Sequence, residues 1–249
     1  MAFWLVSSAS QVLAQNCCDI TSIYQLGDSH TDIGNFIRLS GPASPYSFAA
    51  RPPYGETLGK LTSRHSDGLL IVDYFAKALQ LPLVNPYLAK DVSFENGIVF
   101  SVAGCTALST LLLTVKGIVS PMIPNFPLKN QLFWFRRYLA SICKSPAVCR
   151  KVEDIGRVHC AFKSVLKNAA SLSFNPNSTL KTCCGKGGAY NFDLTTICGT
   201  LTYEVCPSPN EYISWDGIHM TQRGYYHMAQ YLIREILPQL SCPVNEPAN

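Results

Sequence analysis

The sequence predicts an α/β domain with a parallel sheet, because short buried strands alternate along it with amphipathic helices. A first apolar run, 21–26, stops at Gly27 and is followed at once by helical spacing, which indicates a strand, a tight turn and a helix. A second run, 98–103, is β-branched and almost wholly apolar, as in a strand covered on both faces, and it ends at Gly104. A third observation is an amphipathic helix near the end of the chain that Thr221 can cap.

Helical spacing of apolar residues recurs between and after these strands. It predicts helices over 69–79, 130–139 and 161–172, and a last helix after Thr221 whose apolar stripe extends from Tyr225 to Ile236. The segment 41–57 is rich in proline, serine and aromatic residues, so we expect a surface loop there.

Composition and charge limit the size of the domain and its partners. The 249 residues, 47% of them hydrophobic, can bury a large core, and we expect a single domain over 20–242 that is a monomer. The net charge is +4, but the 20 Lys and Arg residues are scattered, so no nucleic-acid partner is expected. No apolar run after the N-terminus approaches the roughly 18 residues that cross a bilayer, so no membrane span is expected.

The 11 cysteines favour an oxidising compartment, because a reducing cytosol would keep them as thiols. Residues 1–14 fit a shortened signal peptide cleaved after Ala14, although the usual basic start is lacking. A ragged N-terminus from an imperfect gene model would look the same. Asn177, followed by Ser and Thr, is a candidate glycosylation site. We therefore expect a secreted protein, either extracellular or vacuolar.

The odd number of cysteines leaves at least one thiol unpaired, unless it pairs with another chain. Two pairs are close enough in sequence to close small loops: Cys143 with Cys149, and Cys198 with Cys206. The adjacent cysteines Cys17-Cys18 and Cys183-Cys184 lack the two-residue spacing of a zinc knuckle, so no metal is expected. The glycines near Lys186 resemble a phosphate-binding loop only superficially, since no Ser or Thr follows the lysine.

Ser29 is the candidate nucleophile, because it lies where the first strand ends and a helix begins. Free backbone N–H groups and the helix dipole at such a turn favour developing negative charge. A serine hydroxyl also needs a base to take its proton and donors to hold the oxyanion. A serine that only caps the helix would present the same segment, so the assignment depends on the base.

Asp216 and His219 are the candidates for that base. The carboxylate lies three residues before the histidine, in a loop that leads into the last helix. Asp216 would accept a hydrogen bond from one imidazole nitrogen and fix the tautomer, so that the other nitrogen faces Ser29. A surface aspartate and a helix-start histidine in an ordinary turn would give the same spacing. The remaining histidines are weaker candidates for the base. We expect His30 to be a pocket or surface residue, and we expect structural roles for His65, His159 and His227.

Together these segments resemble the plant GDSL esterase/lipase family of SGNH hydrolases. The segments that carry the resemblance are 27–35, 53–57, 64–68, 100–108, 183–185 and 216–219. The resemblance implies a three-layer α/β/α, flavodoxin-like fold with a parallel sheet, and a serine esterase or lipase that acts on a small-molecule ester without a cofactor. It makes Ser29, Asp216 and His219 catalytic, and the N–H groups of Ser29 and Gly104 oxyanion donors.

One family block has no counterpart in this sequence. The block Gly-x-Asn-Asp, whose Asn side chain is a further oxyanion donor, is absent between Cys149 and Cys183, which implies an internal deletion near 154–161 and an incomplete sheet. Losing one such donor lowers turnover by about a hundred- to a thousandfold. Three functions therefore stay open. They are ester hydrolysis through an acyl-enzyme on Ser29, an inactive shortened paralogue or isoform that at most binds a partner or ligand, and an acyltransferase using the same site.

Overall fold

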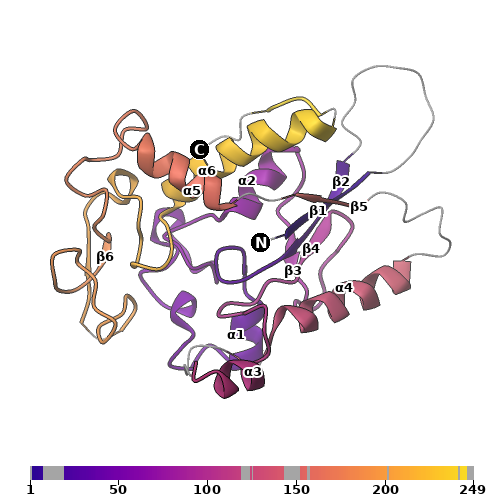
Figure 1. Ribbon diagram of the computed structural model, residues 1–249, viewed down its shortest axis with the longest axis horizontal. Coiled ribbons are helices and arrows are strands. Elements are labelled where there is room, and N and C mark those ends of the chain that lie inside the picture. Colours follow the sequence, from indigo (N-terminus) through magenta and orange to yellow (C-terminus); the bar gives the residue numbers. More distant parts are fainter. Residues whose placement is uncertain are drawn as a thin grey trace.

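The computed structural model describes residues 2–7, 20–118, 124, 126–142, 152–155, 158–200, 202–240 and 242–245, with the backbone alone for 2–7, 152–155 and 158–159. A sheet crosses the middle of the molecule, and helices cover it on both sides (Figure 1). The chain is thus an α/β protein, as its sequence predicts.

The central sheet has five strands in the described part of the chain, in the order β3-β4-β2-β1-β5. Their bounds are β1 (Ala2–Ser7), β2 (Ile20–Leu26), β3 (Asn85–Pro86), β4 (Gly97–Val99) and β5 (Val152–Ile155). The strands β3, β4 and β2 are parallel, whereas β1 lies antiparallel between β2 and β5. The sheet therefore has a parallel half, as expected, and an antiparallel half built around residues 2–7, where the sequence also fits a signal peptide.

The two predicted strands are confirmed as β2 and β4, and they run side by side. β4 is shorter than predicted, but the chain continues beside β2 after it ends. The Phe100 N–H donates to the Gln25 carbonyl at 2.7 Å. The Val102 N–H donates to the Gly27 carbonyl at 3.2 Å. Both segments therefore end at one edge of the sheet, where the turn that carries Ser29 lies next to the turn at 102–105.

Five predicted helices are confirmed as α1, α2, α4, α5 and α6, although α5 begins and ends earlier than its pattern predicts. The helices are α1 (Asn35–Ser40), α2 (Ile71–Ala78), α3 (Thr110–Val115), α4 (Leu128–Ile142), α5 (Val158–Lys167) and α6 (Gln222–Ile236). The predicted loop 41–57 contains a 3₁₀ turn at Phe48–Ala50, and a second turn, Glu56–Leu58, begins at its end. Two further 3₁₀ turns lie near the end of the chain, at Pro209–Glu211 and Leu237–Leu240. A short two-stranded ribbon joins β6 (Cys184–Gly185) to β7 (Glu204–Val205).

Side chains of β2 and β4 alternate across the sheet and build a core on each face. Ile23 and Val99 belong to the core cluster that includes α2, α5 and α6. Tyr24 and Ile98 pack on the other face, against Phe135 of α4. Figure 1 shows α2, α5 and α6 above the sheet and α1, α3 and α4 below it, so the fold is the expected three-layer α/β/α arrangement.

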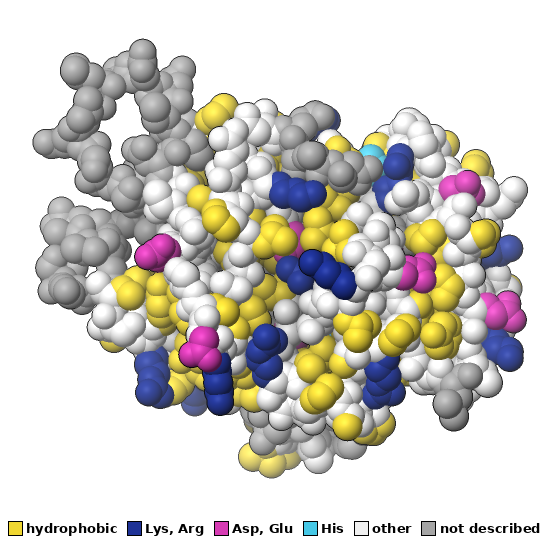
Figure 2. Space-filling view, turned by 180° about the vertical axis from the view of Figure 1, so that it is seen from behind, with side chains coloured by type: hydrophobic (Ala, Val, Ile, Leu, Met, Phe, Trp, Pro, Cys, Tyr) yellow, Lys and Arg dark blue, Asp and Glu magenta, His cyan; other side chains and the backbone are white. Residues whose placement is uncertain are grey.

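The surface mixes charged and apolar side chains. On the face drawn in Figure 2, Lys and Arg side chains are spread among apolar ones. Helix α3 is the most openly apolar, since Leu111 and Val115 are 73% and 77% exposed. None of the helices among the described residues is long and apolar enough to span a membrane.

A buried ion pair fixes the segment that leads into α2. The Arg64 guanidinium donates from Nε and Nη2 to the two carboxylate oxygens of Asp73, at 2.7 and 2.6 Å. Asp73 also accepts the Leu70 N–H at 2.8 Å, at the start of α2. Because the Asp73 side chain is completely buried, its charge depends on Arg64 for compensation.

Replacing Arg64 with alanine should lower the free energy of unfolding by about 3–5 kcal/mol, because the Asp73 carboxylate would be left buried and unpaired. Chemical denaturation monitored by circular dichroism measures this change. The matched control is Arg137→Ala, at an exposed position of α4, which should stay within about 0.5 kcal/mol of wild type. Equal effects of the two substitutions would contradict the role given to the ion pair.

Candidate active site

The turn after β2 presents Ser29, which is half-buried. The Asp28 carbonyl accepts the N–H groups of Thr31 and Asp32 at 3.1 and 3.0 Å. The Asp28 side chain accepts the His30 N–H at 3.1 Å. Asp28 thus holds the backbone on both sides of Ser29 in one tight turn.

Asp32 ties this turn to the neighbouring segment. Its buried carboxylate accepts four backbone N–H groups, from Gly34 and Asn35 at 2.7 Å each, Ala103 at 2.8 Å and Phe36 at 3.0 Å. Three of these bonds satisfy the first N–H groups of α1, and the fourth crosses to the end of the β4 segment. Burial raises the pKa of Asp32 above its ordinary value, although the four N–H donors act in the opposite direction.

Gly104, the second expected oxyanion donor, follows directly on the residue bound to Asp32. It has a φ of 73°, in the left-handed region that favours glycine. From the other side, the Gln131 amide of α4 pairs with the N–H and the carbonyl of Gly27 at 2.9 and 2.8 Å. Within the described residues, neither the Ser29 nor the Gly104 N–H donates a hydrogen bond, so both groups remain available to a ligand.

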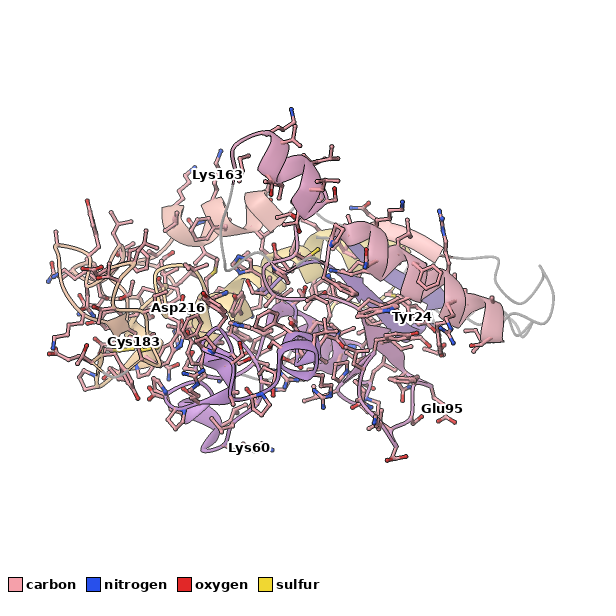
Figure 3. The ribbon with its side chains drawn as sticks, turned by 90° about the horizontal axis from the view of Figure 1, so that it is seen from below. Tyr24, Lys60, Glu95, Lys163, Cys183 and Asp216 are labelled. Carbon is pink, nitrogen blue, oxygen red and sulfur yellow. A yellow bond between two sulfur atoms is a disulfide. The ribbon has the colours of Figure 1, made fainter. Side chains whose placement is uncertain are left out.

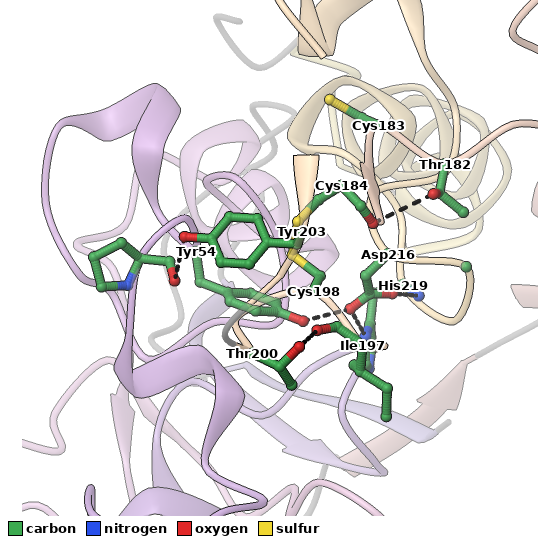
Figure 4. Close-up of a disulfide and its surroundings, with 12 residues drawn as sticks. Tyr54, Thr182, Cys183, Cys184, Ile197, Cys198, Thr200, Tyr203, Asp216 and His219 are labelled. Atoms are coloured by element: carbon green, nitrogen blue, oxygen red, sulfur yellow. Dashed lines mark hydrogen bonds and ion pairs between the residues drawn. A yellow bond between two sulfur atoms is a disulfide. The ribbon is translucent and has the colours of Figure 1, made fainter. Parts of the chain in front are cut away.

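Asp216 and His219 form a buried pair (Figure 4). Oδ2 of Asp216 accepts the Nδ1–H of His219 at 2.6 Å and the hydroxyl of Tyr54 at 2.8 Å. Oδ1 accepts the backbone N–H groups of Ile218 and His219 at 2.9 and 2.7 Å. Burial alone would raise the pKa of Asp216, but the His219 imidazole and these N–H donors hold it well below its usual range. The carboxylate is therefore ionised and fixes the tautomer of His219.

Two disulfides brace the loop that carries Asp216. They join Cys183 to Cys206 and Cys184 to Cys198. The N–H groups of Cys183 and Cys184 donate to the carbonyls of Ser214 and Trp215 at 3.0 and 2.7 Å. Figure 3 shows Cys183 and Asp216 close together, far from Tyr24 at the other end of the molecule. The crosslinked segment therefore supports the backbone immediately before Asp216.

The expected pairing of Cys198 with Cys206 is wrong. Each joins one of the adjacent cysteines Cys183 and Cys184 instead, because neighbouring side chains in an extended segment point to opposite sides. The expected pair Cys143–Cys149 lies outside the described residues. Cys105 and Cys160 are free thiols, and Cys242 is disulfide-bonded.

Two other imidazoles contact that of His219. The ring centroids of His65 and His30 are 4.8 and 5.6 Å from that of His219. Burial, together with the nearby His219, lowers the pKa of His65 to about 3, and the same causes lower the pKa of His30. Both rings are therefore uncharged at neutral pH, and neither opposes a proton on His219.

The nucleophile turn and the base loop meet through His30, which follows Ser29 and faces His219. Nε2 of His219 is buried and has no hydrogen-bond partner among the described residues, so the expected bond to Ser29 is not formed. Catalytic hydrogen bonds are often long in ligand-free enzymes and tighten when substrate binds. The free Nε2 is the atom that a general base needs.

Three residues of this site were not assigned to it from the sequence: Tyr54, His65 and Tyr225. The Tyr225 hydroxyl lies 2.8 Å from Nδ1 of His30, although the sequence assigns this residue only to the apolar stripe of α6. Tyr54 and His65 lie in the segments 53–57 and 64–68, and the resemblance of those segments to the family was the available signal. The side chain of His159 is not described, and His227 contacts Gln230 on α6.

Known proteins that resemble this chain are plant esterases. The chain is similar to acetylajmalan esterase 2 of Rauvolfia serpentina, with 32% identity over 354 aligned residues that cover 97% of this chain and 96% of that protein. It is 33% identical to an acetylajmalan esterase of the same plant, over 90% of this chain and 88% of that protein. Sinapine esterase of Brassica napus is 27% identical, over 88% and 86%.

No family model and no solved structure matches the chain. The identity to the acetylajmalan esterases nevertheless extends over most of both chains, and GDSL esterase/lipases of Arabidopsis thaliana match at 26–28%. The chain therefore belongs to the plant GDSL esterase/lipase family of SGNH hydrolases, a family of carboxylic-ester hydrolases.

Proposed function

We propose that this chain is a secreted serine esterase that hydrolyses small carboxylic esters through an acyl-enzyme on Ser29. The observation that carries the proposal is the buried pair of Asp216 and His219, which leaves Nε2 free beside the turn of Ser29. The names of its relatives, acetylajmalan esterase and sinapine esterase, support a small-molecule ester as substrate.

In the proposed reaction, Oγ of Ser29 attacks the ester carbonyl carbon while Nε2 of His219 takes the hydroxyl proton. The ionised Asp216 stabilises the imidazolium through its bond to Nδ1. The imidazolium then gives its proton to the departing alcohol, which leaves the acyl group on Ser29. A water molecule, deprotonated by His219 in the same way, attacks the acyl-enzyme and releases the acid.

The oxyanion of each tetrahedral intermediate would bind the free N–H groups of Ser29 and Gly104. The family's third donor, the Asn of Gly-x-Asn-Asp, is absent from the sequence. We therefore expect turnover about a hundred- to a thousandfold below that of a relative that has it.

Secretion is supported by the two disulfides, which persist in oxidising compartments. Asn177 is exposed, as a glycosylation acceptor must be. Both observations favour an extracellular or vacuolar location.

A second candidate function is ligand binding without turnover, as a shortened paralogue or isoform. The alignment with acetylajmalan esterase 2 spans 354 positions, which exceeds the 249 residues of this chain by 105, so at least that many positions have no residue here. This gap supports the internal deletion expected near 154–161. Hydrolysis of a small acyl ester that Ser29→Ala abolishes would exclude this candidate, even at the rate about a hundred- to a thousandfold lower that the missing Asn donor predicts. Formation of a new ester with an added alcohol would instead indicate acyl transfer.

A fluorophosphonate probe, which reacts with activated serines, should label the wild-type protein. Ser29→Ala should abolish the label, because the probe bonds to the nucleophile itself. The matched control Ser171→Ala, at an exposed serine beyond α5, should be labelled like wild type. Labelling is read by gel fluorescence, and a label that survives in Ser29→Ala would refute the assignment.

Tyr54→Phe should destabilise the protein by about 1.5–3 kcal/mol, because it removes one of the four donors that compensate the buried charge of Asp216. Turnover should fall with it, since Asp216 would bind His219 less firmly. The matched control is Tyr203→Phe, whose more exposed hydroxyl contacts the Pro52 carbonyl at 3.4 Å in the same region (Figure 4). Thermal unfolding and ester hydrolysis of both variants test the prediction, and it fails if they behave alike.

The stability of the protein should fall as the pH decreases from about 6.5 toward 4.5. The folded-state pKa of His65 is about 3 and its ordinary value is 6.5, so below pH 6.5 the unfolded chain binds a proton that the folded protein does not. Each such proton lowers stability by up to about 1.4 kcal/mol per pH unit. The difference between wild type and His65→Phe in denaturation series across this range isolates His65, because His30 titrates in both. Parallel pH curves would contradict the prediction.

A further inference from the structure

His65 contacts both of the side chains that meet at Asp216. Its ring centroid lies 4.8 Å from that of His219, with 35° between the ring planes. The Tyr54 ring meets it edge-on, with 6.1 Å between the centroids and 75° between the planes. His65 is only 4% exposed, and its Nδ1 has no hydrogen-bond partner among the described residues. Among the described residues, the contacts given for the His65 side chain are therefore ring contacts.

The backbone around His65 is fixed to the element that follows the base. Asp67 accepts the Gln222 N–H at 2.5 Å, and the Leu69 N–H donates to the Gln222 side chain at 2.8 Å. Gln222 begins α6, three residues after His219. On its other side, His65 follows Arg64, which is bound to Asp73. The segment 64–69 and the base loop therefore form one connected unit.

We propose that His65 is a positioning residue for the general base: its ring supports the His219 ring in the orientation in which Nδ1 meets Asp216 and Nε2 stays free for Ser29. This inference rests on the proposed esterase function. A single hydrogen bond at Nδ1 leaves the imidazole free to rotate about that contact. A flat ring packed on its face removes this freedom.

The groups around His219 show why the contribution is packing rather than charge. Asp216 holds Nδ1, and Tyr54 reaches the same carboxylate. The His30 ring also contacts the base ring, at 60°, and the Tyr225 hydroxyl lies 2.8 Å from Nδ1 of His30. His65 and His30 are uncharged at neutral pH, so the two rings pack against His219 without competing for its proton.

The test compares His65→Ala, which removes the ring, with His65→Phe, which keeps a flat ring of similar size without nitrogen. Hydrolysis of p-nitrophenyl acetate should show kcat lower by about a hundredfold in His65→Ala, with KM nearly unchanged, because a misplaced base slows the chemical step alone. His65→Phe should keep kcat within about threefold of wild type. Equal losses in both variants, or an unchanged kcat in His65→Ala, would overturn the proposal.

A second readout does not depend on turnover. The His219 Nδ1 proton, in its short bond to Asp216, should give a low-field proton NMR resonance in wild type and in His65→Phe that broadens or disappears in His65→Ala. If His65→Ala does not fold by circular dichroism, His65→Leu replaces it, since leucine fills volume without a flat face. A wild-type protein without turnover would overturn the proposed function alone, and the NMR comparison would still decide the role of His65. A sharp resonance in all variants would overturn that role.

Discussion

The buried charge of Asp216 is the constraint on which the rest of the site depends. A carboxylate with 3% of its surface exposed needs compensation inside the protein, and four donors provide it. Three of them come from the short turn that also carries His219, so the base pair is largely a local structure. The fourth, the Tyr54 hydroxyl, comes from a segment 162 residues earlier in the chain. The hydrogen bonds to Asp216 therefore join two segments that are far apart in the sequence.

The scaffold brings Ser29, the proposed nucleophile, to the site from a different part of the chain. β2 and the segment after β4 end at one edge of the sheet, and Asp32 ties the two ends together. Ser29 and Gly104 lie in tight turns at this edge, and their N–H groups donate no hydrogen bond within the described part of the chain. The disulfides from Cys183 and Cys184 brace the backbone before Asp216. The candidate site is thus built from a sheet edge and a crosslinked loop.

Much of this arrangement could be predicted from the sequence, because it follows from local patterns. Apolar runs end at Gly27 and at Gly104, which predicted the strands β2 and β4. The amphipathic segment that begins after Thr221 predicted the helix α6. The spacing of Asp216 and His219 predicted their hydrogen bond. The position of β1 was not predictable, since strand direction depends on partners remote in sequence. The same holds for Tyr54 and His65, whose roles arise only where the chain folds back on Asp216, and for the partners of Cys183 and Cys184.

Membership of the GDSL esterase/lipase family agrees with this geometry, and the Gly-x-Asn-Asp block is absent from the sequence. The most direct measurement is mass spectrometry of the protein quenched during incubation with an excess of an activated acyl ester. The account predicts one added acyl group, located on the peptide that contains Ser29. An acyl group on any other residue, or ester turnover with none attached to the protein, would contradict it.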